Sequence, residues 1–185
     1  MGLDGLEDRK PVSADQVLVA VGRRVNHEGL GLEEAGVETG PDGSVKVDSR
    51  LETSLAGVYA VGDLLGPGRP MLAHLASTEG VTAAANALGA DLAVDYSAVP
   101  SAIFTSPEAA SVGLSLAQAL ENGLAAQSHS FQMRALGRAQ ASGELAGLCR
   151  LVSDAETDRV LGAHLIGARS TEIIAECTLA VKMGA

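Results

Sequence analysis

Short apolar runs separated by glycine-rich turns mark the first half of the chain. Residues 17–21, VLVAV, form an uninterrupted run that predicts a buried strand of a parallel sheet, ended by Gly22. Residues 57–61, GVYAV, have the same character and lead directly into Gly62 and Asp63. Because neither run alternates strictly with polar residues, we expect both inside a parallel α/β layer.

Helix signals lie between and after these runs. Residues 30–35 carry a short helical pattern that Gly36 closes, and residues 44–48 alternate apolar and polar side chains as a half-exposed strand does. After a loop rich in glycine and proline, a longer helix is predicted to begin near Met71 and to stop at Gly89. The pattern thus places a strand, a loop and a helix in direct succession.

The pattern changes near Asp95 and Tyr96, where we place a domain boundary. Residues 148–153 and 160–166 are predicted strands, and the polar segment 154–159 between them is short enough for a turn. These two strands therefore form an antiparallel hairpin.

Two helices accompany this hairpin. Ser115 and Gln118 have the spacing of a capping box, and Ser170 is predicted to cap a final helix. The apolar face of that helix consists of Ile173, Ile174, Cys177 and Val181. The expected fold class is α/β then α+β: part of a parallel α/β region over residues 1–95, then an antiparallel sheet with helices over residues 96–185.

Composition and charge indicate which kinds of molecule and membrane this chain is not expected to bind. The formal net charge is −10 and the sequence contains no clustered basic face, so we expect no nucleic-acid partner. No apolar stretch reaches the length of a membrane span, and the polar residues 1–13 do not resemble a leader, so we expect no membrane association and a cytoplasmic location. Aromatic residues make up only 2%, so aliphatic side chains must form the core.

The two cysteines, Cys149 and Cys177, lie far apart in sequence and have no second Cys or His at ligand spacing. They therefore signal neither a metal site nor a local redox pair. We expect both to be buried and chemically inert, because an unpaired cysteine commonly packs as a small apolar residue.

The most informative segment for chemistry is the apolar run that ends in Gly62 and Asp63. Ligands of open parallel sheets bind outside the carboxyl ends of the strands, where a glycine permits close approach and a carboxylate accepts hydrogen bonds from hydroxyl groups. The dipeptide alone is weak evidence, since an aspartate also commonly begins a surface turn.

Three segments taken together are more specific. Gly22-Arg23-Arg24, the segment from Thr53 to Asp63, and the run Met71-Leu72-Ala73-His74 occur in this order. Their combination resembles the flavin-dependent pyridine nucleotide-disulfide oxidoreductases, closest in pattern to dihydrolipoamide dehydrogenases.

The resemblance assigns roles to these segments. It implies that Asp63 binds the ribityl chain of FAD and that the helix start at Met71 faces the flavin ring. It also implies that Gly22 lies near the bound dinucleotide, where the nicotinamide domain returns the chain to the flavin domain. Arg23 and Arg24 receive no role, because solvated arginines are common.

Elementary electrostatics supports the helix start as a cofactor contact. The first turn of a helix has unpaired N–H groups and a partial positive charge, so the N–H groups of Leu72, Ala73 and His74 can stabilise negative charge on reduced flavin. Alternatives remain open: Met71 and Leu72 can be ordinary core residues, and His74 can be a hydrogen-bonded packing residue. His27, His129 and His164 are expected to be structural or on the surface.

The resemblance extends to the second half, which is similar to the family's dimerisation domain and implies a homodimer. The family's glycine-rich FAD phosphate loop, its redox-active cysteine pair and its terminal His-Glu pair have no counterpart in these 185 residues. We therefore expect part of an enzyme that oxidises a dithiol, dihydrolipoamide foremost, through FAD to NAD, and we expect this chain alone to be inactive.

Other interpretations stay open at this point. The chain can be a non-catalytic dimerisation module, or part of another member such as glutathione or mercuric reductase. A 2-oxoacid dehydrogenase complex or a lipoyl protein is a further possible partner.

Overall fold

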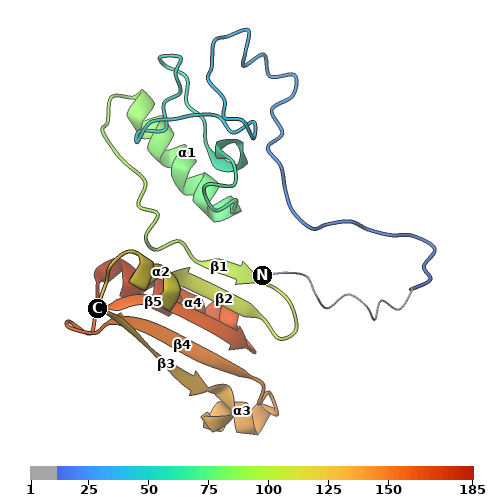
Figure 1. Cartoon of the computed structure of the whole chain (residues 1–185), viewed down its shortest axis with the longest axis vertical. Coiled ribbons are helices and arrows are strands. Elements are labelled where there is room, and N and C mark those ends of the chain that lie inside the picture. The colour runs from blue at the N-terminus through green and yellow to red at the C-terminus, as the bar shows by residue number, and fades with distance from the viewer. Residues whose placement is uncertain (1–11) are drawn as a thin grey trace.

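The computed structural model describes residues 12–185, which form two lobes (Figure 1). Most of the irregular opening segment expected over residues 1–13 lies outside the described residues. In chain order the elements are η1 (Gly62–Leu65), α1 (Ala73–Ala87), β1 (Ser101–Ile103), β2 (Ala109–Gly113), α2 (Leu116–Glu121), β3 (Ala126–Gln132), η2 (Met133–Ala135), α3 (Gly137–Ser142), β4 (Gly147–Asp154), β5 (Val160–Gly167) and α4 (Ser170–Met183).

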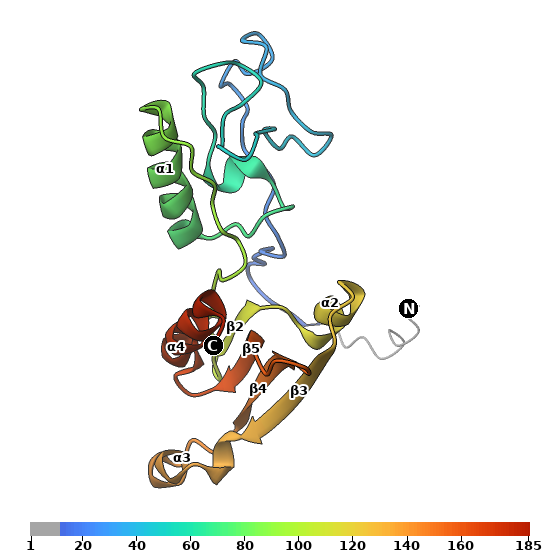
Figure 2. The same cartoon turned by 90° about the vertical axis from the view of Figure 1, so that its left-hand side faces the viewer.

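The C-terminal lobe is a five-stranded antiparallel sheet in the order β1-β2-β5-β4-β3, with α4 packed on one face (Figure 2). Alternate residues of β2 and β5 point toward α4, because successive side chains of a strand face opposite sides. The buried core of this lobe consists of Ala110, Val112, Met133, Ala163, Leu165 and Ile174. The predicted antiparallel sheet is therefore confirmed.

The predicted hairpin is formed by β4 and β5. Asp154 stabilises the turn between them, because its Oδ1 accepts hydrogen bonds from the N–H groups of Glu156 and Thr157 at 3.0 and 2.8 Å. These bonds favour the carboxylate and lower the pKa of Asp154. The capping box of α2 is also confirmed. Ser115 Oγ accepts from the Gln118 N–H, and Gln118 Oε1 accepts from the Ser115 N–H.

The start of α4 differs from the prediction that Ser170 caps it. The capping position is Arg169, in a left-handed conformation, and Ser170 is buried inside the helix with its Oγ donating to the carbonyl of Gly167 at 2.9 Å. The first turn is satisfied from a distant segment: Glu108 Oε2 accepts from Thr171 N at 3.0 Å and Thr171 Oγ1 at 2.7 Å. A carboxylate from another loop thus replaces the expected local cap.

The N-terminal lobe packs loops against α1 around a second buried core, made of Val37, Val45, Leu51, Ala60, Leu65 and Ala83. Its expected half-exposed strand, residues 44–48, takes part only in isolated antiparallel bridges, Thr39 to Val45 and Val47 to Thr53. Residues 32–36 are consecutive turns, so the predicted helix over residues 30–35 is wrong.

The expected burial of residues 17–21 is also wrong. Val17, Leu18, Val19 and Val21 are 76–93% exposed, and no segment among the described residues pairs with them. A strand is buried only when neighbouring strands and covering helices surround it. The residue pattern was correctly identified as apolar, but the described chain does not provide those neighbours.

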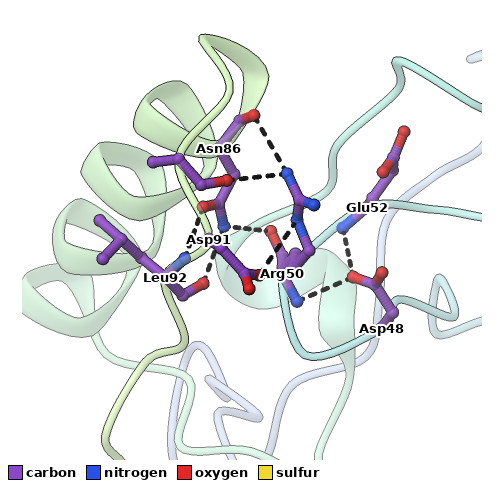
Figure 3. Close-up of polar contacts among 7 residues, drawn as sticks. Asp48, Arg50, Glu52, Asn86, Asp91 and Leu92 are labelled. Atoms are coloured by element: carbon purple, nitrogen blue, oxygen red, sulfur yellow. Dashed lines mark hydrogen bonds and ion pairs between the residues drawn. The ribbon is translucent and has the colours of Figure 1, made fainter.

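A polar cluster joins the C-terminal end of α1 to the loop that precedes the Gly57 turn (Figure 3). Asn86 Nδ2 donates to the carbonyls of Arg50 and Leu92 at 2.9 and 2.8 Å, and Asn86 Oδ1 accepts from Leu92 N at 2.8 Å. The Arg50 guanidinium donates to the carbonyl of Ala90 at 2.8 Å, where the helix dipole favours a cation. These bonds hold the loop against the end of the helix.

Replacing Asn86 by alanine should therefore destabilise the N-terminal lobe. The side chain is buried, and its loss leaves the Leu92 N–H and two carbonyls without a partner, at a cost of about 1–3 kcal/mol. Urea unfolding followed by circular dichroism measures this loss. Asn26→Ala, at an exposed asparagine, is the control, and equal unfolding midpoints for the two variants would contradict the assigned role.

Candidate functional site

The predicted Gly62-Asp63 turn lies against the first half of α1. Gly62 begins the 3-10 helix η1 with φ of +70°, a left-handed conformation that an L side chain rarely adopts. A Cβ placed on Gly62 would lie 3.1 Å from the Cβ of Ala76 on α1. Glycine is thus required here for two reasons, the backbone conformation and the close approach of the helix.

Arg23 brings the three predicted segments together. Its Nη1 lies 3.2 Å from Asp63 Oδ2, and its Nη2 donates to the carbonyl of Met71 at 2.5 Å. The segment after Gly22, the turn at Asp63 and the start of α1 therefore meet at one guanidinium. Arg23 had no predicted role, and the one feature of the sequence that indicates a role is its position directly after Gly22.

The expected helix is confirmed as α1, but fewer of its first N–H groups are free than the sequence predicts. The helix begins at Ala73, Leu72 is its capping residue, and no side chain among the described residues caps this end. Pro70 shapes the entry, because its carbonyl accepts from Leu72 N at 3.0 Å. Of the three N–H groups expected to be available, that of Leu72 is already used, while those of Ala73 and His74 belong to the first helical turn.

The remaining predicted site residues are spread more widely. Met71 and Leu72 are half-buried beside the turn, and Gly22 is exposed. The exposed His74 lines a crevice between α1 and α4, together with Thr178 of α4. The His74 side chain therefore lies at the boundary of the two lobes.

A buried carboxylate lies directly beneath the turn. Glu79 of α1 is 1% exposed, and its Oε2 accepts from Gly62 N at 2.6 Å. Its Oε1 accepts from the hydroxyl of Tyr96 at 2.8 Å, and the Arg69 guanidinium is 3.9 Å away. Glu79 was not among the predicted site residues. It falls four residues after Leu75 on the buried stripe of the helix, where a charged residue indicates a functional or structural role.

Arg69 and Tyr96 complete this network. Arg69 Nη1 donates to the Tyr96 hydroxyl at 2.8 Å, and the guanidinium carbon lies 5.1 Å from the centre of the Tyr96 ring. Burial and the neighbouring Glu79 raise the pKa of Tyr96 to about 12. Tyr96 is therefore neutral at physiological pH and remains a hydrogen-bond donor to Glu79.

The cysteines lie in the other lobe and pack against its core. Cys149 and Cys177 are half-buried rather than fully buried, and burial raises the pKa of both thiols. A raised pKa disfavours the nucleophilic thiolate. Within residues 12–185 no group of three or more His, Cys, Asp or Glu side chains is placed to hold a metal ion. None of the helices described is long and apolar enough to cross a membrane.

The geometry of Gly62 predicts a measurable cost for a side chain there. Gly62→Ala should destabilise the chain more than Gly57→Ala, because Gly57 also has a left-handed φ, +78°, but faces open space. The left-handed conformation costs each variant about 1–2 kcal/mol, and Gly62→Ala adds the contact with Ala76. Thermal unfolding compares the two; an equal loss would show that the helix yields freely at this contact.

Comparison with known proteins identifies the family of this chain. The model of the pyridine nucleotide-disulphide oxidoreductase family matches residues 4–80, and the model of that family's dimerisation domain matches residues 99–185. The chain is 46% identical to a dihydrolipoyl dehydrogenase of Thermus scotoductus, covering 96% of this chain and 38% of the relative. It is 40% identical to the mitochondrial dihydrolipoyl dehydrogenase of Sus scrofa, covering 94% of this chain and 34% of that relative.

Solved structures give the same result. LpdA from Mycobacterium tuberculosis aligns with a TM-score of 0.78 at 29% identity, over 87% of this chain and 35% of that one. The HOCl-induced flavoprotein disulfide reductase RclA from Escherichia coli aligns with a TM-score of 0.80 at 28% identity, over 89% of this chain and 38% of that one. The chain thus spans little more than a third of the length of these relatives, and it belongs to the pyridine nucleotide-disulphide oxidoreductase family.

Proposed function

We propose that this chain forms the flavin-facing turn and the dimerisation domain of an oxidoreductase of the dihydrolipoyl dehydrogenase type. The observation that carries the proposal is the meeting of Gly22-Arg23, Asp63 and Met71 at one guanidinium. Relatives named dihydrolipoyl dehydrogenase, 40–46% identical over most of this chain, support it. The division into residues 1–95 and 96–185 belongs to the same proposal.

The residues around the turn fit FAD. Asp63 is exposed and offers carboxylate oxygens to ribityl hydroxyls. The start of α1 has no side-chain cap among the described residues, so the N–H groups of Ala73 and His74 in its first turn are available to an anion. Met71 and Leu72 supply apolar surface beside the ring, and Gly22 lies toward the dinucleotide. FAD, when bound, supplies two-electron transfer between a dithiol and NAD.

Arg23 contributes orientation in this proposal. Its guanidinium contacts Oδ2 of Asp63 and the Met71 carbonyl, and none of the described residues donates to Asp63 Oδ1, so that oxygen remains for a hydroxyl donor. A carboxylate held on one side by a cation presents its other oxygen in a fixed direction, which is the pre-organisation that ligand binding requires. Gly62 allows the turn to approach the ligand without a side chain in between.

The dithiol substrate we propose is dihydrolipoamide. The relatives at 40–46% identity carry the name dihydrolipoyl dehydrogenase, whereas the disulfide reductase RclA is only 28% identical. A lipoyl protein or a 2-oxoacid dehydrogenase complex is the corresponding partner. A cytoplasmic location remains the expectation from the lengths of the apolar stretches, which are shorter than a membrane span.

Titration of FAD into a fusion that joins this chain to the N-terminal domains of a dihydrolipoyl dehydrogenase tests the cofactor assignment, because those domains carry the family's FAD phosphate loop. Asp63→Ala should weaken binding by about tenfold or more, since a hydrogen bond to a charged group contributes about 1.5–3 kcal/mol. Flavin fluorescence reports the binding, and Glu121→Ala, at an exposed carboxylate on α2, is the control. Equal affinity of Asp63→Ala and the parent chain would remove Asp63 from the site.

The C-terminal lobe favours a second, compatible function, formation of a homodimer. The dimerisation-domain model matches residues 99–185, and this lobe exposes large apolar side chains such as Phe104, Leu179 and Met183. Apolar surface of this kind is typical of a self-complementary interface. The chain by itself should not oxidise dithiols, because Cys149 and Cys177 are held as thiols by burial.

Sedimentation at several concentrations, beside a coupled NADH assay, tests this second function. We expect a monomer–dimer equilibrium and no turnover of dihydrolipoamide above a control without protein. A monomer at every concentration would contradict the interface, and turnover would contradict the expected inactivity.

A further inference from the structure

We propose that Glu79 is the positioning residue of the flavin-facing turn, and that its two oxygens tie Gly62 to Tyr96. The proposal rests on the proposed function, because it concerns how the turn that carries Asp63 is held for its ligand. Glu79 does not itself approach the ligand; it acts from beneath the turn, inside the lobe.

The first step is the contact with the turn. Glu79 Oε2 accepts from Gly62 N at 2.6 Å, and Gly62 has no Cβ that could fix its conformation by packing. The peptide group entering Gly62 is therefore fixed by a buried carboxylate. Because Asp63 follows directly, the orientation of this peptide group sets the direction in which the Asp63 carboxylate leaves the turn.

Burial protects the contact between Glu79 and Gly62 from water. Glu79 is 1% exposed, so a solvent molecule cannot easily replace its partners. A buried charge is stable only when it is paired and hydrogen-bonded, and here Arg69 supplies the pairing while Tyr96 supplies a further hydrogen bond. Removing one member leaves the others unsatisfied, so the group behaves as a unit.

The third step is the connection beyond the N-terminal lobe. Tyr96 follows Asp95, and the Asp95 carboxylate forms an ion pair with Lys182 of α4. This pairing and bonds from Ser97 lower the pKa of Asp95, so the carboxylate stays charged at physiological pH. Polar contacts thus connect Gly62 through Glu79 to Tyr96 at the domain boundary. The neighbouring Asp95 contacts Lys182 on α4 of the dimerisation domain.

The test uses the whole chain and two independent readouts. The first is the Gly62 amide resonance in a nitrogen-15 spectrum without ligand, which reports the hydrogen bond directly. The second is FAD affinity by flavin fluorescence, measured in the fusion with the N-terminal domains of a dihydrolipoyl dehydrogenase. The variants are Glu79→Gln, which keeps one acceptor oxygen but no charge, Glu79→Ala, and Asn86→Ala as a control that weakens the contacts at the C-terminal end of α1.

We expect the Gly62 amide to move upfield in Glu79→Gln, because a neutral acceptor deshields the proton less than a carboxylate does. We expect a larger change in Glu79→Ala and none in Asn86→Ala. FAD affinity should fall by about tenfold in Glu79→Ala, by about threefold in Glu79→Gln and negligibly in Asn86→Ala, following the loss of a charged hydrogen bond.

The outcomes separate this inference from the proposed function. An unchanged Gly62 amide in Glu79→Gln, or the same change in Asn86→Ala, overturns the role of Glu79. If Glu79→Ala does not fold, Glu79→Gln alone decides between these results. A Gly62 amide that responds as expected, together with an FAD affinity of the fusion that is the same in Glu79→Ala and the parent, supports the hold on the turn and contradicts the assignment of this turn to flavin.

Discussion

A single carboxylate inside the N-terminal lobe determines how its parts fit together. Glu79 lies on the buried stripe of α1, where an apolar residue would be ordinary, and it satisfies the Gly62 N–H that no strand neighbour satisfies. An unpaired charge at this depth would be costly, so Arg69 and Tyr96 have to remain in place around it. The pairing of the buried Glu79 charge therefore constrains the loop after η1, helix α1 and the connection to the second lobe.

The two lobes illustrate different sources of order. In the C-terminal lobe, backbone pairing across five strands fixes the register, and α4 covers one face of the sheet. In the N-terminal lobe, strand pairing among the described residues is limited to isolated bridges, so side chains do more of the positioning around α1. The Asn86 cluster holds the C-terminal end of α1 and the Glu79 network holds its middle, and together they fix the helix against both loops.

The sequence was sufficient wherever local rules decide the structure. The β4–β5 hairpin, the capping box of α2 and the helix after Pro70 follow from alternation, capping chemistry and proline placement. It was insufficient where distant segments decide, as with Glu108 at the start of α4 and the exposure of residues 17–21. The same limit applies to the site: Gly62 and Asp63 stand in a recognisable pattern, whereas Arg23 and Glu79 acquire their contacts only through folding.

The exposed segment 17–21 has a consequence for the behaviour of the chain in solution. An exposed apolar segment without a pairing partner among the described residues can pair with the same segment of another copy, so copies of the chain can associate through it. The net charge of −10 opposes that contact by mutual repulsion. Salt shortens the range of the repulsion to about 10 Å at 0.1 M, while apolar attraction persists, so colloidal stability should be greatest in dilute buffer.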